Sequence, residues 1–140
     1  MIKWLALTTL LLLSSICAHA ASAEMTFSGR YEFRTDQESL DMLGKQVCFF
    51  PSGSSARQVP RPVGDKRLPW FCFSDSEAAA RMLGFRLTTP AQGCGVGGRA
   101  TVTVSSYVLY TKEGDGNDMA DIKAVIRKTG PESLPCSQKR

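Results

Sequence analysis

Four widely spaced cysteines, Cys48, Cys72, Cys94 and Cys136, constrain the fold of this 140-residue chain more than any other feature. The fifth cysteine, Cys17, lies in an N-terminal segment that we predict to be removed. Structural zinc sites usually take their cysteines from close C-x-x-C pairs, and redox motifs use the same spacing. The chain contains no such pair. We therefore predict two disulfide bonds and neither a zinc site nor a thiol redox centre.

Four cysteines allow three disulfide connectivities. Cys48 and Cys72 each lie in a short apolar run, QVCFF and WFCFS, of the kind that forms neighbouring strands. We favour Cys48–Cys72 and Cys94–Cys136, because the second bond would tie the C-terminal tail to the loop before a long strand. The two other connectivities remain open at this point.

The N-terminal residues have the pattern of a secretory signal peptide. Lys3 precedes an apolar run over residues 4–16, which is too short for a membrane span, and two A-x-A sites follow. We predict cleavage after Ala23, with Ala20 as the alternative, so that residues 1–23 are removed. The remaining chain has no other apolar segment long enough to span a membrane, and we expect a soluble periplasmic protein.

The only histidine of the chain, His19, lies within the segment that we predict to be removed. Without histidine, a chain cannot form a Ser-His-Asp or Cys-His nucleophile or a His-ligated metal site. Only Glu32, between Tyr31 and Phe33, has an apolar strand context that could raise its pKa, and by alternation its side chain faces water. We therefore expect neither enzymatic activity nor a cofactor.

Hydrophobic patterning predicts five strands and two helices. The strands are expected over residues 25–34, 45–50, 70–73, 99–110 and 119–128. A short helix is expected within residues 35–44, with a capping box of Thr35 and Glu38. A second helix is expected over residues 77–83, with the capping box starting at Ser74 and with Gly84 as its end.

The longest strand, residues 99–110, is expected to place its apolar side chains on one face, namely Ala100, Val102, Val104, Val108 and Tyr110. Residues 85–98 before it are expected to form a loop. This loop contains GCGVGG, which matches the dinucleotide-binding pattern, but such a motif follows a strand and begins a helix. Here a helix precedes the motif and a strand follows it. We therefore interpret the glycines as giving the backbone the conformational freedom to direct Cys94 to its partner.

The predicted order of elements, β-β-β-α-β-β, indicates a mainly β fold. We predict a five-stranded OB-like Greek-key barrel over residues 24–129, with one helix between strands three and four, and a C-terminal tail of residues 130–140 fixed by a disulfide. In this topology alone the chain resembles small exported bacterial proteins with OB-like domains. The alternative is a two-layer α+β sandwich.

A basic connection over residues 51–69 is the leading candidate for a binding site. It carries four cations and is followed by an aromatic residue, and the predicted contact residues are Arg57, Arg61, Lys66, Arg67 and Trp70. OB folds bind ligands through the face of strands two and three and the adjoining loops. We predict a non-catalytic periplasmic module that contacts a periplasmic protein or an acidic cell-envelope ligand, with no nucleic acid.

One alternative function uses the same basic connection. An inhibitor or immunity protein could insert residues 57–67 into the acidic cleft of a cell-wall hydrolase or toxin. The acidic stretch EGDGND, residues 113–118, does not match the spacing of a calcium loop, and we interpret it as a hairpin connection. The sequence does not define an oligomeric state.

Overall fold

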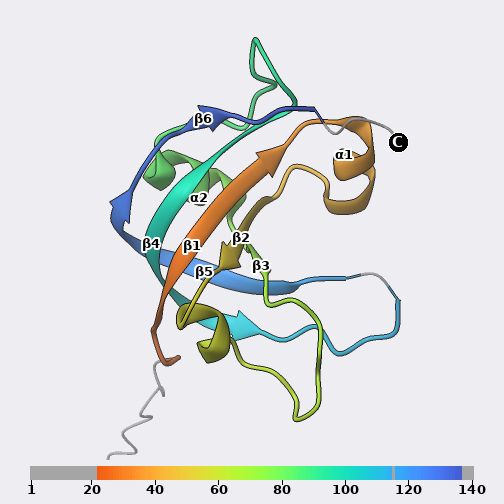
Figure 1. The fold of residues 1–140 in the computed structure, drawn as a ribbon, viewed down its shortest axis with the longest axis vertical. Coiled ribbons are helices and arrows are strands. Elements are labelled where there is room, and N and C mark those ends of the chain that lie inside the picture. The colour runs from red at the N-terminus through yellow and green to blue at the C-terminus, as the bar shows by residue number, and fades with distance from the viewer. Residues whose placement is uncertain (1–21, 115, 137–140) are drawn as a thin grey trace, which may run out of the picture.

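The computed structural model describes residues 22–114 and 116–136 and has a mainly β architecture (Figure 1). Its strands are β1 (Met25–Arg34), β2 (Val47–Pro51), β3 (Phe71–Phe73), β4 (Gly95–Val108), β5 (Asp118–Lys128) and β6 (Glu132–Ser133). Its helices are α1 (Gln37–Leu43), the 3-10 helix η1 (Ser55–Gln58) and α2 (Ser76–Leu83). The predicted helix between the third and fourth strands is confirmed. The predicted signal peptide lies outside the described residues, apart from its last two positions.

One sheet contains all six strands, in the order β1-β2-β3-β5-β4-β6, and β4 also pairs with β1. The pairs are antiparallel except for β3 and β5, which run parallel. Strand β1 pairs with β4 along its whole length and with β2 over residues 29–33. Gly29 makes this double pairing possible, because a side chain there would collide with the β2 backbone at Phe50 and Pro51.

The apolar core is built from the inward side chains of alternating strand positions. Alternation along residues 25–34 predicts that Met25, Phe27, Tyr31 and Phe33 share one face of the strand, and Phe27, Tyr31 and Phe33 are buried in the structure. Phe71 lies at the centre of an aromatic cluster, with its ring centre 5.5 Å from those of Phe27, Phe49 and Tyr107 and 5.6 Å from that of Phe73. Helix α2 covers part of this core with three buried residues, Ala79, Ala80 and Leu83.

Both α-helices form where the sequence predicts them, but their N-caps differ from the prediction. The side chain of Asp36 caps α1 by accepting from the Ser39 amide at 3.0 Å, and Asp75 caps α2 by accepting from the Ala78 amide at 2.8 Å. The predicted caps at Thr35 and Ser74 are therefore wrong by one residue. A carboxylate is also favoured by the positive end of the helix dipole.

The start of β4 corrects the prediction of a loop through residue 98. Gly95, Gly97 and Gly98 belong to β4 and pair with β1. Close neighbours require glycine at two of these positions. A Cβ at Gly98 would lie 2.6 Å from the Tyr31 hydroxyl, and a Cβ at Gly97 would lie 3.0 Å from Leu134. The glycines thus bring the tail and a buried tyrosine against the strand.

The end of β4 also departs from the predicted alternation. Ser106 has a positive φ of 51°, and the register with β5 shifts between Ser105 and Val108. The irregularity turns Tyr107 toward the aromatic cluster and leaves Val108 60% exposed. The prediction that Val108 shares the apolar face is therefore wrong.

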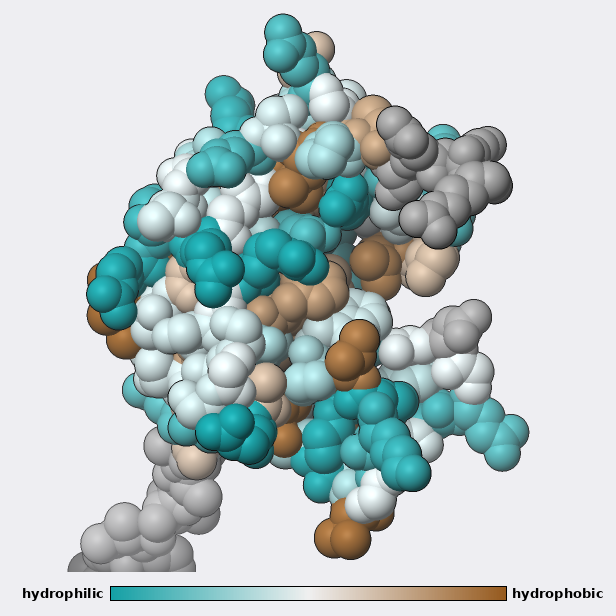
Figure 2. Space-filling model, viewed as in Figure 1, coloured by the Kyte–Doolittle hydropathy of each residue, from teal (hydrophilic) through white to brown (hydrophobic). Residues whose placement is uncertain are grey.

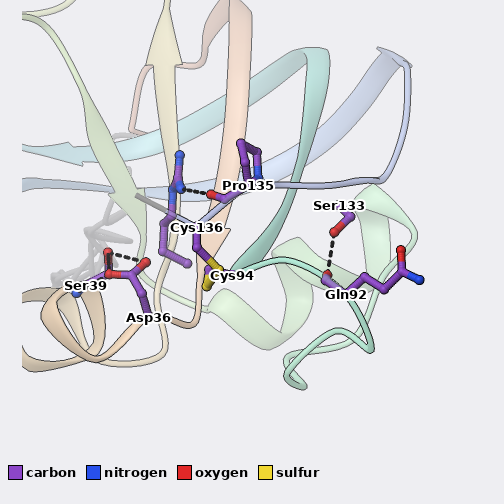
Figure 3. Close-up of a disulfide and its surroundings, with 8 residues drawn as sticks. Asp36, Ser39, Gln92, Cys94, Ser133, Pro135 and Cys136 are labelled. Atoms are coloured by element: carbon purple, nitrogen blue, oxygen red, sulfur yellow. Dashed lines mark hydrogen bonds between the residues drawn. A yellow bond between two sulfur atoms is a disulfide. The ribbon is translucent and has the colours of Figure 1, made fainter. Parts of the chain in front are cut away.

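Both favoured disulfides, Cys48–Cys72 and Cys94–Cys136, are present in the structure. The first joins paired positions of β2 and β3. The second holds the tail, which backbone contacts also fix, since the Cys94 amide donates to the Leu134 carbonyl at 2.8 Å and β6 pairs with β4. Figure 3 shows this bond and the nearby contacts of Ser133 and Pro135. The tail is thus held by more than the disulfide.

Replacing Gly29 tests the double pairing of β1. We expect Gly29→Ala to lower the free energy of unfolding by about 2 kcal/mol, because the added methyl group collides with backbone atoms of β2. Urea denaturation followed by circular dichroism measures the change. The control is Thr26→Ala, at an exposed position of the same strand, with an expected change of about 0.5 kcal/mol or less. Equal effects of the two substitutions would contradict the close approach of β2.

Candidate functional site

Outward side chains of β1 and β2 and of Trp70, the residue directly before β3, form a row across the sheet. Arg30 pairs with Phe50, and the register of β2 and β3 places Phe50 next to Trp70. The ring centres of Phe50 and Trp70 lie 5.9 Å apart with an angle of 15° between the rings, and the guanidinium carbon of Arg30 lies 5.1 Å from the centre of the Phe50 ring. Stacked aromatic rings with a guanidinium over one end form a surface suited to planar ligand groups.

A second row on this face carries Glu32, the Cys48–Cys72 disulfide and Met119. Glu32 lies between two arginines, 2.8 Å from Arg30 Nε and 3.1 Å from Arg34 Nε, and its side chain is 11% exposed. Glu32 lies on the outward face, as predicted, but it does not face open water, because its carboxylate is largely covered. Two guanidinium groups around one carboxylate leave a net positive charge on this row.

A groove of about 530 Å³ opens beside Trp70. Helix α1 forms one wall with Asp41, Met42 and Leu43, and the β4–β5 connection forms the other with Gly114, Gly116 and Asn117, while Arg67 also lines the groove. Figure 2 shows the surface hollowed on the right, between the lobe that carries α1 and the lobe below it. The groove can therefore receive a ligand that lies on the Trp70 ring.

A smaller hollow of about 190 Å³ extends the groove along α1, and Leu43 lines both. Phe50 and Arg34 line the smaller hollow, together with Gln46. The Oε1 atom of Gln46 is buried and has no hydrogen-bond partner among the described residues. A buried acceptor without a partner carries a free-energy cost that a ligand donor would remove.

Asp118, the first residue of β5, fastens the connection before β3 to the sheet. Its side chain is only 1% exposed and accepts from the Tyr107 hydroxyl and from the Tyr110 amide, both at 2.7 Å. Arg61 Nη2 lies 3.3 Å from the same carboxylate, and the Arg61 side chain is 15% exposed. The pKa of Tyr107 is raised in this setting. The largest cause is burial of its hydroxyl group, and the next is the hydrogen bond to Asp118.

Arg61 also closes the loop of residues 61–68 across its base, because its Nη2 donates to the Leu68 carbonyl at 3.4 Å. Asp65 reinforces the closure, with its Oδ2 3.7 Å from Arg61 Nη1 and 2.6 Å from Arg67 Nη2. The hydrogen bonds from the side chain and backbone of Arg67 lower the pKa of Asp65 to about 2. The loop is therefore held in one shape by its own side chains and by Asp118.

A tight turn forms the tip of this loop. The Asp65 amide donates to the Pro62 carbonyl at 3.1 Å, and Gly64 has the positive φ of 85° that such a turn requires. Val63, between them in the turn, is fully exposed, and Leu68 is 81% exposed. A fixed loop with apolar residues in water is suited to contact with a partner surface.

The five predicted contact residues divide into three groups. Arg67 and Trp70 line the groove. Arg57 and Lys66 are exposed outside it and form no ion pair with the residues that the structure describes. Arg61 turns inward, where its guanidinium contacts Asp118, Asp65 and the Leu68 carbonyl, and its contact with a partner stays a prediction.

Sequence reasoning missed Phe50, Arg30 and the α1 wall of the groove. Strand alternation could have identified Phe50, because it lies two residues from Cys48 and therefore shares its outward face. The wall made by α1 depends on how the β1–β2 connection packs, which the sequence pattern does not report.

Among the described residues, the EGDGND stretch does not form a metal site. Asp118 of the EGDGND stretch points to Tyr107 and Arg61, and Asp115 lies outside the described residues. In residues 22–114 and 116–136, no group of three or more His, Cys, Asp or Glu side chains is arranged to hold a metal ion. No helix in this part of the chain is long and apolar enough to cross a membrane.

Comparisons with known proteins found no matching family model, no matching curated protein and no matching solved structure.

Substitution of Asp118 tests the attachment of the loop. We expect Asp118→Ala to lower the free energy of unfolding by about 3 kcal/mol, because it leaves the Tyr107 hydroxyl, the Tyr110 amide and the Arg61 guanidinium without their partner. Chemical denaturation gives the value. Asp121→Ala removes another acid of β5 that forms no ion pair within the described ranges and should cost about 0.5 kcal/mol or less. The attachment would be refuted if Asp118→Ala were as mild as this control.

Proposed function

We propose that this protein is an exported, non-catalytic binding module, stabilised by its two disulfides, whose ligand lies in the groove beside Trp70. The observation that carries the proposal is the continuous Arg30–Phe50–Trp70 row, which opens onto the groove. The N-terminal pattern of residues 1–23 supports export to the periplasm, and the disulfides fit an oxidising compartment.

We also propose that the domain is an OB-like Greek-key barrel. The strand pairings that support this begin at β1, run through β2, β3, β5 and β4, and include a pairing of β4 with β1. In OB folds, ligands lie across strands two and three between the first and the last interstrand loops. The groove has the corresponding position, because α1 belongs to the β1–β2 connection and Gly114 to the β4–β5 connection.

The chemistry of the groove favours an acidic oligosaccharide of the cell envelope. The exposed face of a stacked aromatic pair suits the apolar face of a sugar ring. Arg67 at one end and the net positive charge around Glu32 at the other favour carboxylate groups on the ligand. The unpartnered Gln46 Oε1 can accept a hydrogen bond from a hydroxyl or amide of the ligand.

Trp70 provides a direct test, because it is the single tryptophan after residue 23. We expect muropeptides from digested peptidoglycan, or uronic-acid oligosaccharides, to change the Trp70 fluorescence in a saturable manner. Arg67→Ser with Arg30→Ser should weaken this binding by about tenfold, and Trp70→Ala should weaken it similarly in calorimetry. The control is Arg81→Ser with Arg86→Ser, two exposed arginines outside the groove. Binding that is absent, or unchanged in the groove variants, would contradict the proposal.

A second candidate function is inhibition of a cell-wall hydrolase, and the closed loop of residues 61–68 favours it. The loop presents Val63 at a fixed turn, and preformed loops lose little conformational entropy when they enter a cleft. Lys66 in the same loop is exposed, and its positive charge suits a cleft with acidic side chains.

Inhibition assays against lysozymes and amidases test this second candidate. We expect the protein to slow one of these enzymes and Val63→Asp to abolish the effect, because a charged tip is repelled by an apolar or acidic cleft. Val108→Asp is the matched control, since Val108 is also exposed but lies at the end of β4. Equal inhibition by both variants, or none across the panel, would refute the role of the loop.

A further inference from the structure

A second hollow, of about 250 Å³, lies over β1, β4 and the end of β5. It shares no lining residue with the groove beside Trp70. Its lining consists of small residues, hydroxyl side chains and cations, and its charged members are Arg99, Arg127 and Lys128. In Figure 2 the surface in front, over β1 and β4, is mostly white and teal, which marks residues of intermediate to hydrophilic character.

Strand pairing brings the three cations together from two strands. Lys128 pairs with Ala100 and Arg127 pairs with Thr101, next to Arg99 on β4. The register then shifts, since the following residue of β4, Val102, pairs with Val125 and leaves Ile126 as an extra residue on β5. An extra residue of this kind redirects the side chains beside it, and such irregularities are common at binding sites.

The positive charge of this hollow is not neutralised within the described ranges. Arg99, Arg127 and Lys128 form no ion pair there, and Lys128 Nζ donates only to the Met82 carbonyl, at 3.1 Å. Arg99 also lies opposite Arg30 on the neighbouring strand. Like charges on paired strands repel each other, so an anion bound here would relieve an unfavourable interaction.

Hydroxyl groups lie between these cations. The Ser28 and Thr101 hydroxyl oxygens are 2.9 Å apart, so one donates to the other and one hydroxyl hydrogen stays available for a ligand. Thr129 contributes a third hydroxyl, which accepts from the Arg99 amide at 3.3 Å.

We propose that this hollow binds a tetrahedral oxyanion of the phosphate or sulfate class. Two guanidinium groups supply paired donors that match the oxygen atoms of such an anion, and the hydroxyl groups supply single donors. The ammonium of Lys128 is directed to the Met82 carbonyl and adds positive charge near the hollow. The anion is either free phosphate or the phosphate group of a lipid headgroup. This inference does not rest on the proposed function, because it uses none of the residues that line the groove.

The test is an NMR titration of the ¹⁵N-labelled full chain with sodium phosphate and sodium sulfate, at constant ionic strength set with sodium chloride. We expect saturable shifts of the Arg99, Thr101 and Thr129 amides. Arg99→Ser with Arg127→Ser should weaken the affinity at least about tenfold, because it removes both guanidinium partners. The matched control, Arg81→Ser with Arg86→Ser, removes the same charge elsewhere and should bind as the unmodified protein does.

A vesicle sedimentation assay distinguishes free phosphate from the phosphate group of a lipid headgroup. Stronger binding to phosphatidylglycerol vesicles than to phosphatidylcholine vesicles, lost in Arg99→Ser with Arg127→Ser, assigns the site to a lipid headgroup. Saturable phosphate binding without vesicle binding assigns it to the free ion. The proposal is overturned if neither occurs, or if the shifts match those with chloride alone or are equal in both double variants.

Discussion

The candidate binding surface depends on the contacts that the buried carboxylate of Asp118 makes. This carboxylate joins the start of β5 to the end of β4 through Tyr107 and Tyr110, and to the connection before β3 through Arg61. Burying a charge is unfavourable unless partners replace its hydration, and here a hydroxyl, an amide and a guanidinium do so. Through Arg61, Asp118 thus holds the base of the loop of residues 61–68 against the sheet.

The rest of the scaffold is held rigidly by close backbone packing. Gly29 lets β2 approach β1, and Gly97 and Gly98 let the tail and Tyr31 approach β4. The disulfides add a bond between β2 and β3 and another between the tail and the start of β4. Because the outer rows of side chains lie on this scaffold, Arg30, Phe50 and Trp70 keep a fixed spacing.

The sequence was sufficient to predict those parts of the fold that local patterns of residue types determine. Alternation identified the inward residues of β1, and Gly84 marked the end of α2. The glycines at the start of β4 were predicted to form a loop, because glycine-rich stretches favour turns. In the structure they lie within a strand, where the close approach of Leu134 and Tyr31 requires them. The face of Val108 was misjudged because the irregularity at Ser106 is not visible in the pattern of residue types.

The candidate site was less predictable than the fold, for a physical reason. Arg57, Arg61, Lys66 and Arg67 look equivalent in a basic stretch, and only the tertiary position of Asp118 separates Arg61 from the others. The groove needs three segments that are distant in sequence, α1, Trp70 and the β4–β5 connection. Local composition therefore predicted Arg67 and Trp70 of the groove lining but not the residues that α1 and the β4–β5 connection contribute.

Asp118 and Arg61 hold the loop of residues 61–68 in one shape. The most direct measurement is ¹⁵N relaxation of the Val63 and Gly64 amides. We predict order parameters of about 0.85, similar to those of a rigid backbone, although both residues lie at the tip of an exposed turn. Order parameters below about 0.6 at these two amides would contradict the claim.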